Sequence, residues 1–549
     1  MQMRWTSSVV PGIFGLLAAG FLQASDVPSG PMPQETDELR ESGRQVYIQR
    51  CSFCHGLMGD GNGPAADYMD PRPRDFTLGI YKFRTTQSGE LPTNEDLFRT
   101  ISRGLAGTGM QAFDRDVIKN GLTEDERWAV IAYIKTFAFE FQDPELDPVA
   151  TGMVISLPEN MAPYNEETIA RGKEVFEHAK CWECHGKQGR GDGQKSFDRT
   201  DDWGYPIRIR NLTLPWNIKA GSQVKGIYMR FSTGILGTPM PSFVDALSAE
   251  ERWDLANYIK SLQVERTKGE VVKALLIEGD LPDDPLDPQW DTVERTDFRL
   301  AGQVIGAPRW QNPSIDLVTV RAMFNTDEVV FLLSWDDPFK DVVHNQSEEV
   351  DFQEISQPGA YSSYVPAHDA IPRQLETFRD SVALQFPAKA VEGTRKPHFF
   401  RGSSSAAVNL WVWKSDAAEQ GQRAVDEMNV RGWKQRPKVQ DEEDQQVVSS
   451  AIWDQGRWHV LMKRSLGTDD SNDVQFQQGK FIPLALNAWD GSNGEHGLVM
   501  SLSSWYYLVL EEPTPISAYI IGLLAILLTA WLGVLLMRKA KAQNEFETI

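Results

Sequence analysis

Residues Cys51–Gly63 read CSFCHGLMGDGNG, and residues Cys181–Gly193 read CWECHGKQGRGDG. These two stretches hold all four cysteines of the 549-residue chain, and in both a histidine follows the Cys-x-x-Cys pair directly. A chain of this length is expected to form about two to four domains. Because the cysteines are confined to two copies of one pattern, the sequence indicates a duplicated site.

The segments around the two motifs are copies of each other, 130 residues apart. LTEDERWAVIAYIKTF in the first copy parallels LSAEERWDLANYIKSL in the second. Thr123 and Ser248 in these segments are typical N-caps, and a glutamate three residues later completes a capping box. With apolar residues at helical spacing, each copy predicts a small all-α domain. The expected domains span residues 35–141 and 166–265, joined by a linker at 142–165 that is rich in Pro and Glu.

The motif itself, Cys-x-x-Cys-His, is the attachment signature of c-type haem. Cys51 and Cys54 in one copy, and Cys181 and Cys184 in the other, would bond to the two vinyl groups of a porphyrin. Zinc would need four ligands at each site, and no second Cys/His pair lies near either motif. A disulfide oxidoreductase would need a βαβ pattern, and a simple disulfide would leave the histidines unexplained. The sequence therefore predicts two covalent c haems.

The axial ligands of the iron can be assigned by comparing the copies. His55 and His185 follow the cysteines, and Met110 and Met240 each come 55 residues after their histidine. A methionine on a helix stripe usually fills a core, but these two lie in Gly-Thr-x-Met-x-x-Phe loops in both copies. Met58 is too close to His55 to reach the opposite face of a haem. We expect Met110 and Met240 to be distal ligands, with packing as the alternative role.

Both copies resemble the class I cytochrome c family in the Cys-x-x-Cys-His motif, the late loop methionine and the closing aromatic helix. The resemblance implies that the first and last helices of each domain cross, with Gly43 and Gly172 facing the closing helix. Arg74 and Arg210 occupy matching loops, RPRDFT and RIRNLT. They are candidates for contacts with haem propionates, and the alternative is that both are ordinary surface arginines.

The ends of the chain carry two hydrophobic segments. Residues 1–25 combine an early arginine with an apolar run, which predicts an export signal. Ile516–Met537 contains no charge, and as a helix of ~33 Å it would cross a bilayer. Because basic residues begin the tail at 538–549, the positive-inside rule predicts a cytoplasmic tail and a periplasmic main body. A formal net charge of −22 argues against a nucleic-acid partner.

After about Val272 the helical periodicity stops. Short β-type runs follow, including LVTVRAMF, VVFLLSW, SVALQFP, AVNLWVW, WHVLMKR and KFIPLALNAW. The turn sequence NTDE lies between the first two runs, and DQG precedes a later one, so two hairpins are predicted. Regular short strands at this spacing predict an antiparallel β-sandwich over residues 273–511.

The order of these runs resembles the haem-binding gamma subunit of ethylbenzene dehydrogenase and dimethylsulfide dehydrogenase. AMFNTDEVVFLLSWDD, DSVALQFP, VNLWVWK, RWHVLMKRSL and IPLALNAWDG carry the resemblance. It implies a sandwich that holds one non-covalent haem b between Met and Lys ligands. Between Asp380 and Trp413 this chain has no methionine, but it has His398, and Lys480 is the late lysine. The alternatives are a loop histidine and a solvated lysine.

These features favour a membrane-anchored electron-transfer subunit over an enzyme, because His/Met ligation leaves haem iron no open position for a substrate. The gamma-like domain implies a molybdenum oxidoreductase as partner, such as a nitrite/nitrate oxidoreductase. A soluble cytochrome or an oxidase of the respiratory chain would be the other partner. One alternative is a cytochrome c subunit of a quinol-oxidising complex. Another is a haem-linked binding module whose sandwich holds no haem.

The number and type of haems can be measured by a pyridine haemochrome spectrum of the full chain, taken before and after acid–acetone extraction. We expect two covalent c haems per chain and one extractable b haem. Two c haems with nothing extractable would leave the third domain without haem. The absence of covalent haem would refute the interpretation of both cysteine motifs.

Overall fold

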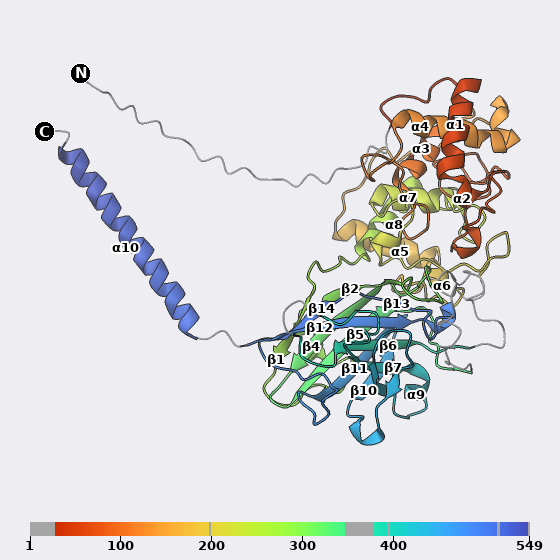
Figure 1. Ribbon diagram of the computed structural model, residues 1–549. Coiled ribbons are helices and arrows are strands. Elements are labelled where there is room, and N and C mark those ends of the chain that lie inside the picture. Colours follow the sequence, from red (N-terminus) through yellow and green to blue (C-terminus); the bar gives the residue numbers. More distant parts are fainter. Residues whose placement is uncertain (1–27, 197–198, 346–376, 392–395, 513–515, 547–549) are drawn as a thin grey trace. The chain divides into compact units, whose positions relative to one another are not determined.

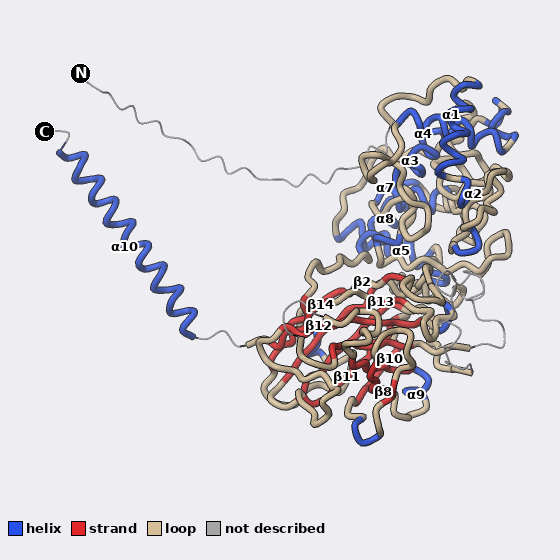
Figure 2. Tube along the Cα trace, viewed as in Figure 1, coloured by secondary structure: helices blue, strands red, loops and turns tan. Residues whose placement is uncertain are grey.

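The chain folds into two units, the first rich in helices and the second rich in strands (Figures 1 and 2). One unit ends at Val264 and the other begins at Glu265. The export signal expected in residues 1–25 lies outside the described residues. The computed structural model describes residues 28–196, 199–345, 377–391, 396–512 and 516–546.

The helical unit contains one arrangement twice: a long helix, a one-turn helix with cysteine and histidine, a third helix and a closing helix. The prediction of two helical copies is therefore confirmed. The predicted capping boxes are also present, because Thr123 and Ser248 accept hydrogen bonds from the N–H groups of Glu126 and Glu251. The first copy contains α1 (Asp37–Arg50), α2 (Ser52–His55), α3 (Asn94–Arg103) and α4 (Glu124–Ile134). The second contains α5 (Glu166–His178), α6 (Trp182–His185), α7 (Val224–Thr233) and α8 (Ala249–Ser261).

In each copy the first helix crosses the last at a glycine. A Cβ atom at Gly43 of α1 would overlap the carbonyl oxygen of Ala129 in α4. Gly172 of α5 lies equally close to the carbonyl oxygen of Asp254 in α8. Only a residue without a side chain permits this approach of two backbones. One turn after Gly43, the rings of Tyr47 and Tyr133 extend the contact, with centroids 5.4 Å apart.

The tryptophans of the closing helices contact the third helix of each copy. Trp128 of α4 lies against Phe98 of α3, with ring centroids 4.4 Å apart. Trp253 of α8 lies against Tyr228 of α7 at 5.7 Å. These aromatic side chains are buried, so each copy has its own core between three helices.

The two copies also contact each other within the helical unit. The side chain of Arg84 is fully buried, and its Nη2 donates to the carbonyl oxygen of Thr233 at 2.9 Å. In return, Nη2 of Arg230 donates to the carbonyl oxygen of Arg84 at 2.9 Å. The connecting segment contacts both copies. The N–H of Ile155 donates to the carbonyl oxygen of Thr85, and the Ile155 side chain lies in the core of the second copy. The copies therefore form one packed pair.

The second unit contains one continuous path of strands. Its order is β10-β11-β5-β4-β1-β14-β12-β6-β7-β8-β9, with β2, β3 and β13 joined at the side. A short helix, α9 (Ser415–Glu419), follows β7. The strands are β1 (Val271–Leu276), β2 (Thr296–Arg299), β3 (Ala301–Gly302), β4 (Leu317–Phe324), β5 (Glu328–Asp336), β6 (Ser381–Pro387) and β7 (Val408–Lys414). They continue with β8 (Val425–Val430), β9 (Lys438–Val439), β10 (Val448–Trp453), β11 (Arg457–Ser465), β12 (Phe481–Trp489), β13 (Ser501–Leu502) and β14 (Tyr506–Leu510).

The expectation of a purely antiparallel domain needs correction at β1. This strand is parallel to both of its neighbours, pairing Val271 with Tyr507 of β14 and Leu275 with Met323 of β4. The sheet is therefore mixed, because the first and the last strands of the domain run in the same direction. The two predicted hairpins are confirmed, since β4–β5 and β10–β11 are antiparallel pairs.

The main core of this unit lies between strands that are not neighbours in the sheet. Phe331 of β5 contacts Phe386 of β6 at 5.9 Å and Trp411 of β7 at 6.0 Å between ring centroids. All three side chains are fully buried. Because β5 and β6 are separated by four strands along the path, the sheet must turn back on itself. A sandwich remains a prediction for this mixed sheet.

The C-terminal apolar segment is helical, as α10 (Ile516–Phe546). Residues Ile520–Arg538 of this helix have a mean hydropathy of 2.6 and are long and apolar enough to cross a membrane. One such helix agrees with a membrane anchor.

The glycine crossing can be tested by Gly43→Ala. The added methyl group would meet the Ala129 carbonyl, so we expect the first helical domain to lose about 1–3 kcal/mol of stability. Thermal unfolding followed by Soret absorbance measures the loss. Gly30→Ala is the control, because no atom lies within 4 Å of its Cβ position. Equal unfolding midpoints for the two variants would contradict the close crossing.

Candidate functional site

The cysteines are placed by the junction between a long helix and a single helical turn. The N–H of Cys51 donates to the carbonyl oxygen of Tyr47 at 2.8 Å, which ends α1, and α2 starts at the next residue. The second copy repeats the junction, with the N–H of Cys181 donating to Phe176 at 3.1 Å. All four cysteines are free thiols and partly buried. Burial raises the pKa of Cys51 to about 12 and that of Cys181 to about 11.

Both predicted histidine ligands have the same hydrogen-bond partner. His55 Nδ1 lies 2.9 Å from the carbonyl oxygen of Arg74, and His185 Nδ1 lies 3.0 Å from that of Arg210. Because a carbonyl oxygen only accepts, each Nδ1 carries the hydrogen and each Nε2 keeps its lone pair. Burial lowers the pKa of both histidines, so the rings are neutral. A neutral imidazole fixed through Nδ1 is the form that ligates a metal.

The two candidate distal methionines lie in loops of identical design. The N–H of Met110 donates to Oγ1 of Thr108 at 3.1 Å, and the N–H of Met240 donates to Oγ1 of Thr238 at 3.3 Å. The carbonyl oxygen of Met110 accepts from Leu105 at 2.9 Å, which closes the loop. Both methionine side chains are partly buried against the core of their own copy. The loops thus hold the methionines by backbone contacts rather than by a helix.

One difference separates the two copies at the histidine. The ring of Phe76 stacks on His55, with centroids 4.5 Å apart and an interplanar angle of 18°. Leu212 holds the matching place in RIRNLT, and its N–H donates to Gly189 as the N–H of Phe76 donates to Gly59. The two sites therefore share their backbone frame and differ in the side chain beside the ligand.

Arg74 and Arg210 belong to a group of four basic residues, the basic cluster, in which Lys82 and Lys219 are the other members. Trp203 of the second copy joins them, with its ring centroid 4.4 Å from the Arg74 guanidinium and 5.7 Å from Lys82 Nζ. Burial lowers the pKa of Arg74 to about 10. The cluster therefore combines residues of both copies at one place.

The positive charges in the basic cluster act on one another. Burial and then the charge of Arg74 lower the pKa of Lys82 to about 8. Burial, followed by Arg210 and Lys82, lowers the pKa of Lys219 well below its ordinary value. Nearby carboxylates offset part of this repulsion: Asp70, Asp201 and Asp202. Buried cations need anionic partners, so the basic cluster suits additional carboxylates.

Sequence reasoning missed Lys82 and Lys219, although a signal was present. Each lysine follows the matched arginine of its copy, Lys82 eight residues after Arg74 and Lys219 nine residues after Arg210. A comparison of the copies beyond RPRDFT and RIRNLT would have paired them. Their spatial meeting depends on the contact between the two copies.

The residues present fit two c haems. Each copy offers two free thiols, a neutral histidine with an available Nε2, and a loop methionine packed on the same core. The basic cluster provides positive charge for propionates. Both copies therefore offer the same groups to a haem, with the same local contacts.

The candidate haem b ligands of the sheet-rich unit, in contrast, are exposed and lie outside its cavity. His398 is exposed in the loop between β6 and β7, where its ring stacks on Phe399 at 4.6 Å and its Nδ1 accepts from the N–H of Phe400 at 3.0 Å. Lys480 is exposed in the turn before β12. Neither residue lines the cavity of about 240 Å³ in this unit. Its lining includes His344, Met428, His496, Arg379, Arg401 and Arg436.

Comparison with known families assigns the two kinds of domain. The cytochrome c family matches residues 41–138 and 169–263, and the ethylbenzene dehydrogenase family matches residues 287–439. The chain therefore carries two cytochrome c domains followed by a domain like the gamma subunit of ethylbenzene dehydrogenase.

The chain is also similar to individual proteins. A proposed respiratory nitrate reductase haem subunit from Haloferax mediterranei is 26% identical over 236 residues, which is 43% of this chain and 71% of the relative. A chlorate reductase gamma subunit from Ideonella dechloratans is 24% identical over 141 residues, covering 26% of this chain and 54% of the relative. A solved chain of a reducing HAO-like protein complex from Kuenenia stuttgartiensis is 41% identical, with a TM-score of 0.39, covering 43% of this chain and 100% of that chain.

The protein is thus a haem-containing electron-transfer subunit related to haem subunits of respiratory oxidoreductases. Cytochrome c domains imply covalent haem c, and the gamma-like domain suggests haem b.

The distal ligands can be tested by Met110→Ala and Met240→Ala. Each substitution should remove one thioether ligand, weaken the ligand-field band at the red edge of the ferric spectrum, and let the ferrous protein bind carbon monoxide. Met58→Ala is the control, because Met58 is 71% exposed. An unchanged band in both test variants would show that the methionines only fill space.

Proposed function

We propose that the chain is a membrane-anchored cytochrome subunit that carries electrons between a redox enzyme and a partner of the respiratory chain. The observation that carries this proposal is the duplicated ligand frame. His55 and His185 have the same carbonyl partner, and Met110 and Met240 lie in the same loop. Two sites with both axial positions filled favour electron transfer over substrate chemistry.

In this proposal each residue type has one role. Cys51, Cys54, Cys181 and Cys184 hold the porphyrins by thioether bonds. The histidines and methionines named above would hold the iron. When bound, each haem supplies a one-electron Fe(III)/Fe(II) couple. The helix junctions and loops keep the ligands in place, so that little has to move when an electron arrives.

The basic cluster supports a close pairing of the two sites. Arg74 and Lys82 come from the first domain, and Arg210 and Lys219 from the second. Propionates of both haems would balance these charges, as buried cations require. The cluster would then orient the two groups toward each other, and it would stabilise the contact between the domains.

The relatives and α10 support a place for the protein in a membrane complex. Two relatives are named as subunits of nitrate and chlorate reductases. We infer a molybdenum oxidoreductase of this kind as one partner and a soluble cytochrome or oxidase as the other. Ile520–Arg538 would anchor the chain with the main body on the periplasmic side, because the basic residues follow the span.

A haem b in the sheet-rich unit is part of the proposal, but its ligands need revision. His398 and Lys480 are exposed and do not line the cavity. The cavity carries His344, His496 and Met428, which are residue types that ligate haem iron.

Potentiometry of the full chain in detergent tests the proposal through Lys219→Met. Propionates at the basic cluster would keep Lys219 in its charged form, and loss of that positive charge favours the ferric state, so the potential of at least one haem should fall by tens of millivolts. Lys225→Met is the matched control, since Lys225 is exposed on α7 of the same domain and the charge change is equal. The reduced wild-type chain should also reduce an oxidised soluble cytochrome c in stopped-flow mixing.

Two outcomes would contradict this function. Carbon monoxide binding to the wild-type ferrous chain would reveal an open iron position and favour an enzyme. Equal potentials in the two lysine variants would remove the basic cluster from the haem environment.

A further inference from the structure

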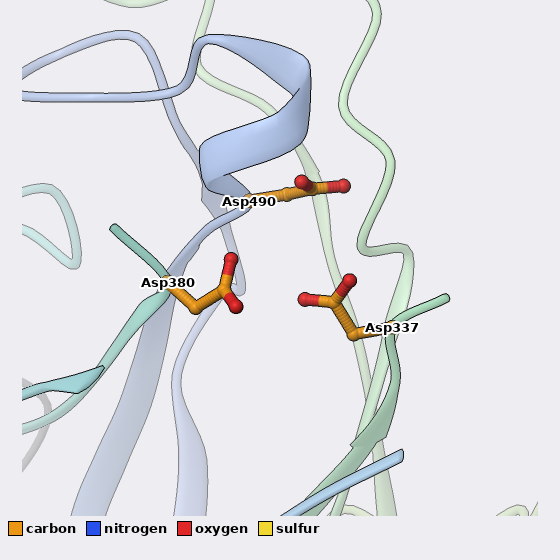
Figure 3. A group of neighbouring side chains, drawn as sticks. All are labelled: Asp337, Asp380 and Asp490. Atoms are coloured by element: carbon orange, nitrogen blue, oxygen red, sulfur yellow. The ribbon is translucent and has the colours of Figure 1, made fainter. Parts of the chain in front are cut away.

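Three buried aspartates meet at one end of the sheet-rich unit (Figure 3). Asp337 follows β5, Asp380 precedes β6, and Asp490 follows β12. One carboxylate oxygen from each lies within 4.8 Å of the other two. Strands β6 and β12 are paired, but β5 lies elsewhere along the strand path. The cluster therefore joins parts of the sheet that no backbone ladder connects directly.

Two of the three carboxylates are held in place by neutral donors. Asp380 accepts from the N–H of Gly491 at 3.0 Å and from Nε1 of Trp458 at 2.9 Å. Asp490 accepts from the N–H of Asn493 at 3.1 Å and from the hydroxyl of Ser314. These bonds fix the side chains as acceptors. They hold these two carboxylates at the place where the three aspartates meet.

The third carboxylate has an oxygen without a partner. Asp337 is 1% exposed, and its Oδ1 accepts from the N–H of Phe339 at 3.2 Å. Within the described parts of the chain, no donor reaches its Oδ2. Figure 3 shows this carboxylate turned toward Asp380 and Asp490. An unsatisfied buried carboxylate oxygen is costly, so its orientation indicates a missing positive partner.

The electrostatic surroundings of Asp337 also indicate a missing positive partner. Burial and the neighbouring charges of Asp380, Asp490 and Asp341 raise the pKa of Asp337 well above its ordinary value. Burial, Asp341 and Asp490 do the same for Asp380. Among the described residues, the charged neighbours that act on these two groups include Asp341 and Asp490, which are both carboxylates. Such a cluster must either keep protons or hold a cation.

We propose that Asp337, Asp380 and Asp490 bind a calcium ion that fastens β5 to the paired strands β6 and β12. Calcium takes oxygen ligands at about 2.3–2.6 Å, so two ligand oxygens lie up to about 5 Å apart. Magnesium binds at about 2.0–2.1 Å and fits a tighter group. Asp341 is adjacent and supplies a further carboxylate, and water completes the shell.

The site is independent of the haem domains, so its test does not depend on electron transfer. The full chain in detergent is stripped with EGTA and passed into calcium-free buffer. Calcium or magnesium chloride alone is then added. Metal analysis after desalting should give about one calcium per chain. At about a hundred times Kd, calcium should raise the unfolding midpoint of the sheet-rich unit by roughly 5–10 °C, and magnesium should raise it less.

Asp337→Asn is the test variant, because it keeps the shape of the side chain and removes its charge. After desalting it should hold about one tenth of the wild-type calcium or less, and calcium should no longer raise its unfolding midpoint. Asp336→Asn is the matched control on the neighbouring residue, which pairs with Arg457 instead. Since chelation of the wild type needs no variant, misfolding of Asp337→Asn would leave the first measurement decisive.

The proposal fails if the wild type retains no calcium and its midpoint is the same in EGTA and in calcium. The cluster would then be a group of protonated carboxyls. In that case stability should fall as pH rises above the ordinary pKa of aspartate, because carboxyls with a raised folded pKa hold protons that the unfolded chain releases.

Discussion

The close contact between the first and last helices fixes the positions of both haem sites. Gly43 and Gly172 bring one backbone against the next, and no other residue type would let the helices meet at that distance. Since α1 ends directly before Cys51 and α5 ends three residues before Cys181, the crossing also sets where the thiols and histidines lie. The loops with the methionines close over the same cores. A shift of the crossing would displace both axial sides at once.

Charge is the second principle that organises the helical unit. The histidines are kept neutral, while arginines and lysines gather where the copies meet. Arg74 combines the two tasks, because its carbonyl oxygen orients His55 and its guanidinium lies over Trp203. One loop thus couples the orientation of a ligand to the contact between domains. In the second copy, the carbonyl oxygen of Arg210 in RIRNLT orients His185 in the same way.

Much of the fold could be predicted from sequence, because residues close together in the chain determine its helix ends and hairpins. The capping boxes at Thr123 and Ser248 and the hairpins of the sheet are local features, and they are present as expected. Strand β8 was missed because it contains Glu427, whose burial beside Arg464 has no hydropathy signal. Lys82 and Lys219 were missed because only tertiary contact brings them together. The three aspartates of the proposed calcium site converge for the same reason.

The parallel strand β1 determines how late in synthesis the sheet can form. It leaves the ribosome before every other strand of its domain, yet half of its ladder is formed with β14, about 230 residues later. The sheet therefore cannot close until synthesis has almost reached α10. During that interval β1 has an open edge, and exposed edges pair readily with other chains. A protein that crosses a membrane before it folds meets this requirement more easily, because translation is complete when the first and last strands meet.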